Sequence, residues 1–262
     1  MYFSEAAITD LKNGLGEIET KYLTLREEFV QYPFKTQRGR EYGTQGFGRR
    51  IGTLARCIER VFSDLPPETK GVPCRETLMD VSINLQAMTT NVSGCLDNLT
   101  WTWVYEKAVV QPDGRELEQK MVGLGKTYKY VWRSFSVPFR DYLRSRADWF
   151  AHIKEFRDAL AHRIPLYIPP YSVDPKNQDR YNELEQASWA ALLAGKLDEH
   201  NFLVKEQAKL KFFRPIMAHS LVEGSALAVF HAQLLADFNT IEELGRRFLA
   251  EMQALDPAPS HQ

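Results

Sequence analysis

The residues with the clearest potential for chemistry lie in the segment Glu155–Pro165, which holds Arg157, Asp158 and His162 within six positions. An arginine is always charged, and its planar guanidinium suits a phosphoryl group. A histidine titrates near neutral pH, so it can give or take a proton while a phosphodiester is cleaved. The segment therefore predicts a site that binds phosphate and moves a proton without a metal ion.

The bare spacing of this pair has little specificity, because an arginine precedes a histidine by five or six residues at three places in the chain. The other two pairs are Arg146 with His152 and Arg214 with His219. Only the pair that begins at Arg157 has an acidic residue directly after the arginine. The Arg157 segment is therefore the best candidate of the three.

A helix over residues 147–163 is expected to position this segment. Its apolar stripe consists of Trp149, Ile153, Phe156 and Leu160. At about 100° per residue, Arg157 falls at the edge of the stripe, and His162 points roughly 140° away from Arg157 around the axis. Two arrangements would bring these side chains together: a loosened last turn before Pro165, or a site shared by two copies of the chain.

The same segment also has a purely structural interpretation. Histidine and arginine are favoured in the last turn of a helix, where they interact with the macrodipole and with free carbonyl groups. His162 and Arg163 fit this position, because Pro165 follows directly. The alternative prediction is therefore a non-catalytic helical interaction or scaffold module, in which the segment only ends a helix.

The clearest periodic signal lies between Arg75 and Lys107, where apolar residues follow one another in alternating steps of three and four. These residues are Leu78, Val81, Leu85, Met88, Val92, Cys95 and Leu99. Such a repeat places one apolar seam along a long helix that suits packing in a bundle.

The rest of the chain predicts more helix than strand. Further helices are expected over residues 4–32, 49–62, 126–134, 138–143, 180–197 and 215–252, the last carrying His219 and His231. The glycine-rich stretch Arg38–Gly48 predicts a mobile loop, and residues 200–213 predict a short hairpin. The spaced prolines of 164–171 predict an extended strap. The expected fold is a single all-α domain over 1–262, an antiparallel helical bundle with a long central helix and a proline-rich extended strap.

Composition excludes several classes of protein. With a net charge of -1, the chain does not resemble one that coats nucleic acid, and no DNA partner is predicted. It has no basic and apolar leader and no apolar run of 18 residues, so a cytoplasmic protein with no membrane contact is expected. The three cysteines show no CxxC spacing, so neither a disulfide framework nor a zinc site is predicted.

Charge is unevenly distributed along the chain. Between Lys35 and Arg60, seven Lys or Arg face two Glu, and between Lys126 and Arg146, six face one Asp. From Glu223 onward, six acids face two arginines. This asymmetry could guide an anionic ligand to one side of the molecule, although solvated helix faces would produce the same pattern.

No metal or cofactor site is predicted. The order His152-x-x-Glu155 is the reverse of the Glu-x-x-His pairs of di-iron bundles, and no HExxH or GxSxG pattern is present. Gly123–Thr127 is similar to a phosphate loop, but Lys120 stands where the first glycine is needed, so a turn is expected.

Aromatic residues gather at two places that could stack bases if they were exposed. The run Trp101–Tyr105 follows the apolar seam, which favours core packing instead. Tyr167 and Tyr171 lie on the proline strap and are the better candidates for an exposed stacking or docking surface.

The arrangement of Arg157, Asp158 and His162 resembles that of the HEPN superfamily, helical-bundle proteins of which many are metal-independent ribonucleases or nucleotide-transfer partners. The segment Ser93–Leu99 looks like the Leu-Asp-His/Asn-Leu helix of uncharacterised bacterial HEPN-like proteins. The resemblance covers residues 75–165. The helices within 1–63 and 180–252 are then expected to be additions to the bundle.

This resemblance implies a mechanism. His162 would act as general acid and base on the ribose 2′-hydroxyl or the leaving oxygen, Arg157 would hold the phosphate, and Asp158 would orient one of them. The residues expected to bind RNA or its phosphate nearby are Asp97, Asn98, Arg146 and Arg163. Sites in this family are usually formed by two protomers, so a homodimer is implied.

Overall fold

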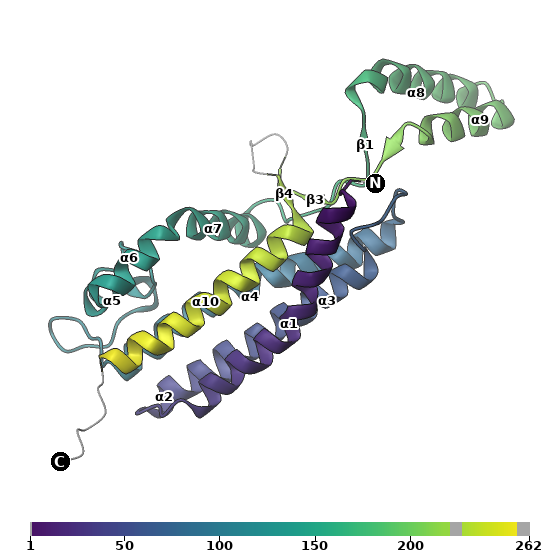
Figure 1. Ribbon diagram of the computed structural model, residues 1–262. Helices are drawn as coiled ribbons and strands as arrows, with labels where there is room; N and C mark the ends of the chain where they lie inside the picture. The colour runs from purple at the N-terminus through teal and green to yellow at the C-terminus, as the bar shows by residue number, and fades with distance from the viewer. Residues whose placement is uncertain (1, 221–226, 256–262) are drawn as a thin grey trace, which may run out of the picture.

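The computed structural model describes residues 2–220 and 227–255, and this part of the chain is predominantly helical (Figure 1). The α-helices are α1 (Glu5–Gln31), α2 (Gln37–Arg40), α3 (Gly48–Asp64), α4 (Arg75–Glu106), α5 (Lys129–Ser134), α6 (Val137–Ser145), α7 (Ala147–His162), α8 (Gln178–Leu193), α9 (Leu197–Ala208) and α10 (Phe230–Ala254). A π-helix, η1 (Glu41–Phe47), and two short 3-10 turns, η2 (Gln119–Met121) and η3 (Pro175–Asn177), accompany them. The predicted all-α fold class is confirmed.

The strands among the described residues form two small antiparallel sheets. In one, β1 (Ser172–Val173) pairs with β2 (Lys211–Phe212), and in the other, β3 (Ile216–Met217) pairs with β4 (Ala228–Val229). The first sheet joins the segments on either side of α8 and α9, and the second joins two segments that lie shortly before α10.

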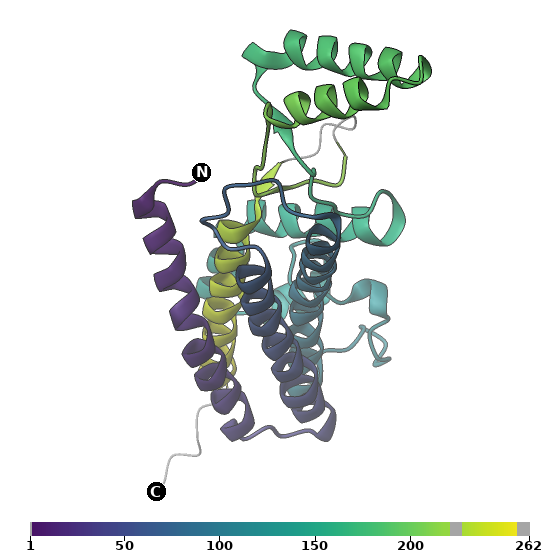
Figure 2. The ribbon, with the colours of Figure 1, turned by 90° about the vertical axis from the view of Figure 1, so that its right-hand side faces the viewer.

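The core of the molecule is a bundle in which α1, α3, α4 and α10 lie side by side (Figures 1 and 2). The predicted seam of α4 faces this core, and all seven of its apolar residues are buried. The largest side chains with essentially no exposed surface include Trp103, Phe29, Phe47, Phe230, Phe238 and Phe248. Burial of this apolar surface is the dominant force that holds the bundle together.

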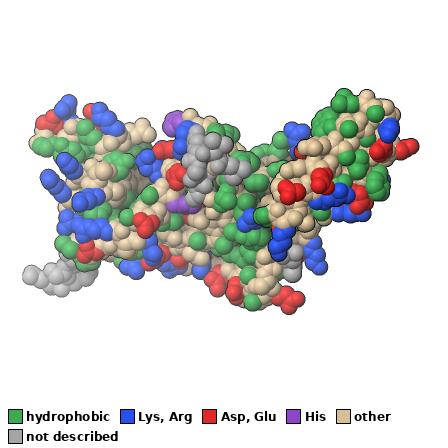
Figure 3. Space-filling model, turned by 90° about the horizontal axis from the view of Figure 1, so that it is seen from above, with side chains coloured by type: hydrophobic (Ala, Val, Ile, Leu, Met, Phe, Trp, Pro, Cys, Tyr) green, Lys and Arg blue, Asp and Glu red, His purple; other side chains and the backbone are tan. Residues whose placement is uncertain are grey.

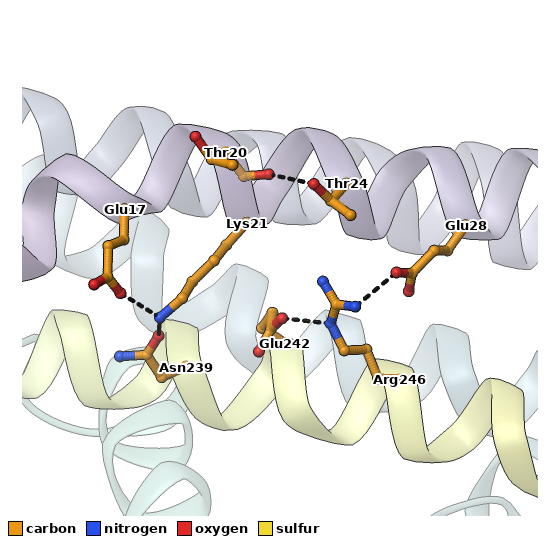
Figure 4. A network of polar contacts seen from close by, with 8 residues as sticks. All are labelled: Glu17, Thr20, Lys21, Thr24, Glu28, Asn239, Glu242 and Arg246. Atoms are coloured by element: carbon orange, nitrogen blue, oxygen red, sulfur yellow. Dashed lines mark hydrogen bonds and ion pairs between the residues drawn. The ribbon is translucent and has the colours of Figure 1, made fainter.

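Polar contacts at the edge of the bundle fix how α1 lies along α10 (Figure 4). Lys21 of α1 donates to Asn239 Oδ1 of α10 at 2.9 Å, and Arg246 of α10 reaches Glu28 of α1 at 2.7 Å. Because these groups are partly exposed, each contact contributes about 1 kcal/mol or less. They set the register of the two helices and add little to the stability that the core provides.

The prediction of a mobile loop over Arg38–Gly48 is wrong, because the stretch is helical from α2 through η1 into α3. Its glycines serve close packing and do not break the helix. A Cβ on Gly46 would lie 2.8 Å from Cγ of Asn98 on α4, so only glycine allows this approach. The sequence pattern for a loop was overridden by a contact with a distant helix.

The start of α2 is held by a buried carboxylate. Glu106, at the end of α4, accepts hydrogen bonds from the backbone N–H of Lys35 at 2.8 Å and of Thr36 at 2.9 Å. The Thr36 hydroxyl donates to the same carboxylate at 2.6 Å and caps α2 by accepting from Gly39 N–H. Glu106 is therefore a structural residue that ties the α2–η1 segment to α4.

The C-terminal helix begins later than predicted. α10 starts at Phe230 and not at Pro215, and the intervening described residues include β3 and β4. His219 consequently lies outside the helix to which the sequence assigned it. The predicted hairpin over residues 200–213 is also wrong, because residues through Ala208 continue α9 and the strand Lys211–Phe212 pairs with Ser172–Val173.

The proline strap is extended, as predicted. Leu166 and Ile168 are buried, and Tyr167 forms an isolated antiparallel bridge with Ala218. Tyr171 is half-buried, and its hydroxyl lies 2.9 Å from that of Tyr181. The strap thus connects the bundle to α8.

Helices α8 and α9 form an arm that projects away from the bundle (Figures 1 and 2). Tyr181, Leu184, Ser188 and Ala191 make one buried face of α8, against α9. Apolar side chains gather over this arm, whereas Lys and Arg gather at the opposite end of the molecule, where α5 and α6 lie (Figure 3). Of the helices that the structure describes, none is long and apolar enough to cross a membrane.

Candidate functional site

Arg157 and Asp158 lie on α7, which packs against α4 through a face that includes Ile153, Phe156 and Ala159. The Nε atom of Arg157 lies 3.0 Å from Oδ1 of Asp158, and Lys154 Nζ donates to Oδ2 of Asp158 at 2.7 Å. Asp158 therefore stands between two cations on the surface of α7.

These cations determine the ionisation of Asp158. The hydrogen bond from Lys154 lowers the pKa of Asp158, and the charges of Arg157, Lys154 and His162 lower it further, while partial burial opposes the shift. Asp158 is thus a carboxylate at neutral pH. It can orient Arg157 through the ion pair that the two side chains form.

The charge of Arg157 also influences the pKa of Asp97 on α4. Desolvation raises the pKa of Asp97, although its side chain still reaches solvent, and the charges of Arg157 and Arg50 oppose that rise. Arg50 belongs to α3, so residues from three helices contribute to the electrostatics at one place. Arg157 and Asp97 come from the two segments that carry the family resemblance, and the packing of α7 on α4 places them within range of each other's charge.

Asn98 lies in a polar cluster with α3. Arg50 donates from Nε to Asn98 Oδ1 at 2.9 Å and from Nη1 to Asn91 Oδ1 at 3.0 Å. Its guanidinium lies flat over Gly94, where a Cβ would be 2.3 Å from Cζ of Arg50. Sequence reasoning missed Arg50, but the spacing of Asn91, Gly94 and Asn98 by three and four residues is a signal that could have pointed to a partner.

His162 is the last residue of α7 and is exposed. The helix stays regular up to this point, because the N–H of Arg163 still bonds to the carbonyl of Ala159 at 2.9 Å. The loosened last turn is therefore not observed. Five regular residues place Arg157 and His162 about 7.5 Å apart along the axis and roughly 140° apart around it, so within one chain the two side chains diverge.

The remaining two candidates lie at opposite ends of α7. Arg163 follows His162 and is exposed. Arg146 precedes the helix, forms an ion pair with Glu243 of α10 at 2.6 Å, and stacks on Tyr142. Eleven residues of helix separate Arg146 from Arg157 by about 16 Å, so the structure does not bring Arg146 to the Arg157 site.

The histidines of the two rejected pairs are less accessible to solvent than His162. His219 is 1% exposed, and its Nε2 lies 3.3 Å from Glu155 Oε1. His152 is half-buried against the ring of Phe156, and burial lowers its pKa. Their poor access to solvent leaves His162 as the better acid–base candidate.

Another buried histidine, His231, is a packed residue. Its Nε2 lies 2.7 Å from the carbonyl of Leu65, and desolvation lowers its pKa to about 4, so the ring is neutral and donates this hydrogen bond. Among the described residues, no group of three or more His, Cys, Asp and Glu could hold a metal ion.

No family model matches the chain, and neither a curated protein nor a solved structure is significantly similar to it. The fold and the geometry of the Arg157 face are therefore the grounds on which a function is inferred.

Proposed function

We propose that this protein is a HEPN-like, metal-independent endoribonuclease that acts as a homodimer in the cytoplasm. The observation that supports this proposal is the packing of α7 against α4, which places the charge of Arg157 near enough to Asp97 to oppose the rise that burial causes in the pKa of that carboxyl. These residues belong to the two segments that resemble the family. An arginine that is held by a neighbouring carboxylate, and still half-exposed, suits contact with a phosphate.

The chemistry needs one acid–base group and one cation. His162 removes the proton from a ribose 2′-hydroxyl, the 2′-oxygen attacks the phosphorus, and the bond to the 5′-oxygen breaks. The leaving oxygen takes a proton from the imidazolium, so the products are a 2′,3′-cyclic phosphate and a 5′-hydroxyl. Arg157 stabilises the negative charge that develops on the phosphoryl oxygens.

Because Arg157 and His162 diverge on one regular helix, we propose that each active site takes Arg157 from one protomer and His162 from the other. Homodimers with twofold symmetry present the same patch on both copies, so two such sites would form. Arg163, adjacent to His162 and exposed, would add positive charge on the side that contributes the histidine.

The test is cleavage of single-stranded RNA in EDTA by wild type, Arg157→Ala, His162→Ala, and a remixed sample of the two variants. Each variant alone should be inactive. Half of the remixed dimers would be mixed, each with one intact site of two, so about a quarter of wild-type activity should return. An inactive mixture rejects the shared site, and wild-type protein without activity rejects the nuclease.

The arm supports a second candidate, a non-catalytic interaction module. Trp189, Leu193 and Phe202 are 60%, 86% and 61% exposed, which is unusual for large apolar side chains on a two-helix hairpin. In this case no RNA would be cleaved. Light scattering would show self-association of the wild type, and the double variant Trp189→Ser/Leu193→Ser would abolish it.

A further inference from the structure

A pocket of about 470 Å³ lies on the face where α2 and η1 meet the C-terminal half of α4. Its lining includes Arg38, Glu41, Tyr42, Gln45, Asn98 and Tyr105. The volume falls within the range of pockets that hold small ligands, roughly 300–1,000 Å³. Arg157 and His162 do not line this pocket, so it is distinct from the candidate cleavage site.

One wall of the pocket is formed by Tyr42 and Tyr105, and Trp101 packs against both rings from outside the pocket lining. The rings of Trp101 and Tyr105, one helical turn apart on α4, are stacked with centroids 5.5 Å apart and planes 21° apart. Tyr42 of η1 lies 5.6 Å from Tyr105 and 6.1 Å from Trp101. All three are half-buried, whereas neighbouring Trp103 is completely buried in the core. The cluster thus leaves aromatic surface in contact with solvent, which suits stacking of a planar ligand.

A cation lies at the edge of this wall. The guanidinium of Arg38 is centred 5.1 Å from the Tyr105 ring, and Glu116 holds it through a hydrogen bond of 3.0 Å. Arg38 remains more than half exposed. An arginine fixed in this way can contact a phosphate that is attached to a ligand stacked on Tyr105.

Amide groups from two helices complete the rim. The Oδ1 atom of Asn98 already accepts from Arg50, so its Nδ2 group is left to donate. Gln45 is exposed on η1 and offers both a donor and an acceptor. Edges of nucleobases carry such donors and acceptors in fixed positions, and asparagine and glutamine pair with them well.

The π-helix explains why these groups converge. A π-helix is rare and is frequently found at functional sites, because its wider turn displaces side chains from their α-helical positions. Here η1 carries Tyr42 and Gln45, and Gly46 allows it to lie against Asn98. The buried anchor Glu106 fixes the preceding segment, so the pocket is formed before any ligand arrives.

We propose that this pocket binds a nucleotide, whose base stacks on Tyr42 and Tyr105. Asn98 and Gln45 then bond to the edge of the base, and Arg38 contacts the phosphate of the nucleotide. The identification of RNA as the source of the base rests on the proposed function. The binding of a base in this pocket does not depend on that function. Asn98 directly follows Asp97 on α4, so an RNA strand seated here would pass close to the Arg157 face.

The test is a titration of full-length His162→Ala protein, in which the candidate acid–base group is absent. The probes are AMP, UMP, ribose 5-phosphate and single-stranded RNA hexamers, measured by tryptophan fluorescence and by calorimetry. The mononucleotides and the hexamers should bind saturably, and ribose 5-phosphate should bind at least about tenfold more weakly, because it lacks the stacking base. Preference for hexamers over mononucleotides identifies RNA as the source of the base.

Matched variants locate the binding. Tyr105→Ala should weaken the binding of AMP about tenfold, and Tyr105→Phe should keep most of it, since the ring and not the hydroxyl stacks. Tyr130→Ala, at an exposed tyrosine in a separate basic pocket formed around α5, should change nothing. Circular dichroism confirms that each variant is folded.

The proposal is overturned if AMP and ribose 5-phosphate bind equally, if no probe binds, or if Tyr130→Ala weakens binding and Tyr105→Ala does not. None of these outcomes affects RNA cleavage by wild-type protein. Conversely, base binding without any cleavage would reject the nuclease and leave the pocket intact, so the two proposals fail separately.

Discussion

Helix α4 presents two adjacent stripes with opposite properties. The first runs through Leu85, Val92 and Leu99 and is buried in the bundle. The second lies one residue earlier at the C-terminal half of the helix and consists of Asn91, Gly94, Asn98, Trp101 and Tyr105. It carries amides and half-exposed rings. Both stripes repeat in steps of three and four residues. The first stabilises the bundle, and the second presents groups that can contact the proposed nucleotide.

The buried stripe should show the largest effect on stability. Leu85 is 1% exposed, so Leu85→Ala removes packed atoms and leaves a cavity. We expect a loss of about 2–5 kcal/mol in the free energy of unfolding. Urea denaturation measures it, and Ile83→Ala, at a 58% exposed position of the same helix, is the control and should change stability by about 0.5 kcal/mol or less. Equal losses from the two variants would contradict the assignment of faces.

Asp237 on α10 is an ionisable group buried inside the bundle, so its effect on stability should depend on pH. Its Oδ1 accepts from Trp149 Nε1 at 2.8 Å and from Gln233 at 2.7 Å, and desolvation raises its pKa to about 6. The folded state therefore binds a proton that the unfolded state loses near pH 4. The stabilisation from this proton is complete below that pH and is lost as pH rises through about 6. Asp237→Asn keeps the acceptor without the charge and should stabilise the protein at pH 7.5 by up to about 3 kcal/mol.

His231 has the opposite dependence on pH. Its pKa of about 4 in the folded state lies below the ordinary value, so the unfolded state binds the extra proton, and stability is lost as pH falls from about 6.5 through 4. The two residues therefore offset one another between about pH 4 and 6. In Asp237→Asn only the histidine remains, so unfolding free energy should rise more steeply with pH than in wild type. Parallel pH profiles for the two proteins would refute this account.

Glu106 lies at the end of α4, and its buried carboxylate anchors the start of α2. In Glu106→Gln, an amide N–H₂ replaces one of the acceptor oxygens, so at least one of the bonds from Lys35 or Thr36 is lost. We expect a loss of about 1–3 kcal/mol in unfolding free energy. Thermal unfolding checks this value, and an unchanged midpoint would mean that the carboxylate is not needed to hold α2.

The seam of α4 could be predicted because a repeat of three and four residues is a local property of the sequence. The helical state of Arg38–Gly48 could not, since the packing role of Gly46 depends on Asn98, some fifty residues later along the chain. Likewise, Arg50 was missed because its partners, Asn91 and Asn98, lie on another helix. The divergence of Arg157 and His162 was predictable, because it follows from helix geometry alone.

The smallest effect separates the structural role of the second stripe from its role in recognition. Asn91 and Asn98 each accept one hydrogen bond from Arg50, at 3.0 and 2.9 Å. Asn91→Ala and Asn98→Ala should therefore cost a similar amount, about 1 kcal/mol each, because both bonds are only partly buried. Only Asn98 lines the pocket beside Tyr105, so only Asn98→Ala should also weaken the binding of AMP. If both variants lose stability equally and neither changes AMP binding, Asn91 and Asn98 serve only to attach α3 to α4. If AMP binding falls in Asn98→Ala alone, Asn98 has a role in recognition beyond its bond to Arg50.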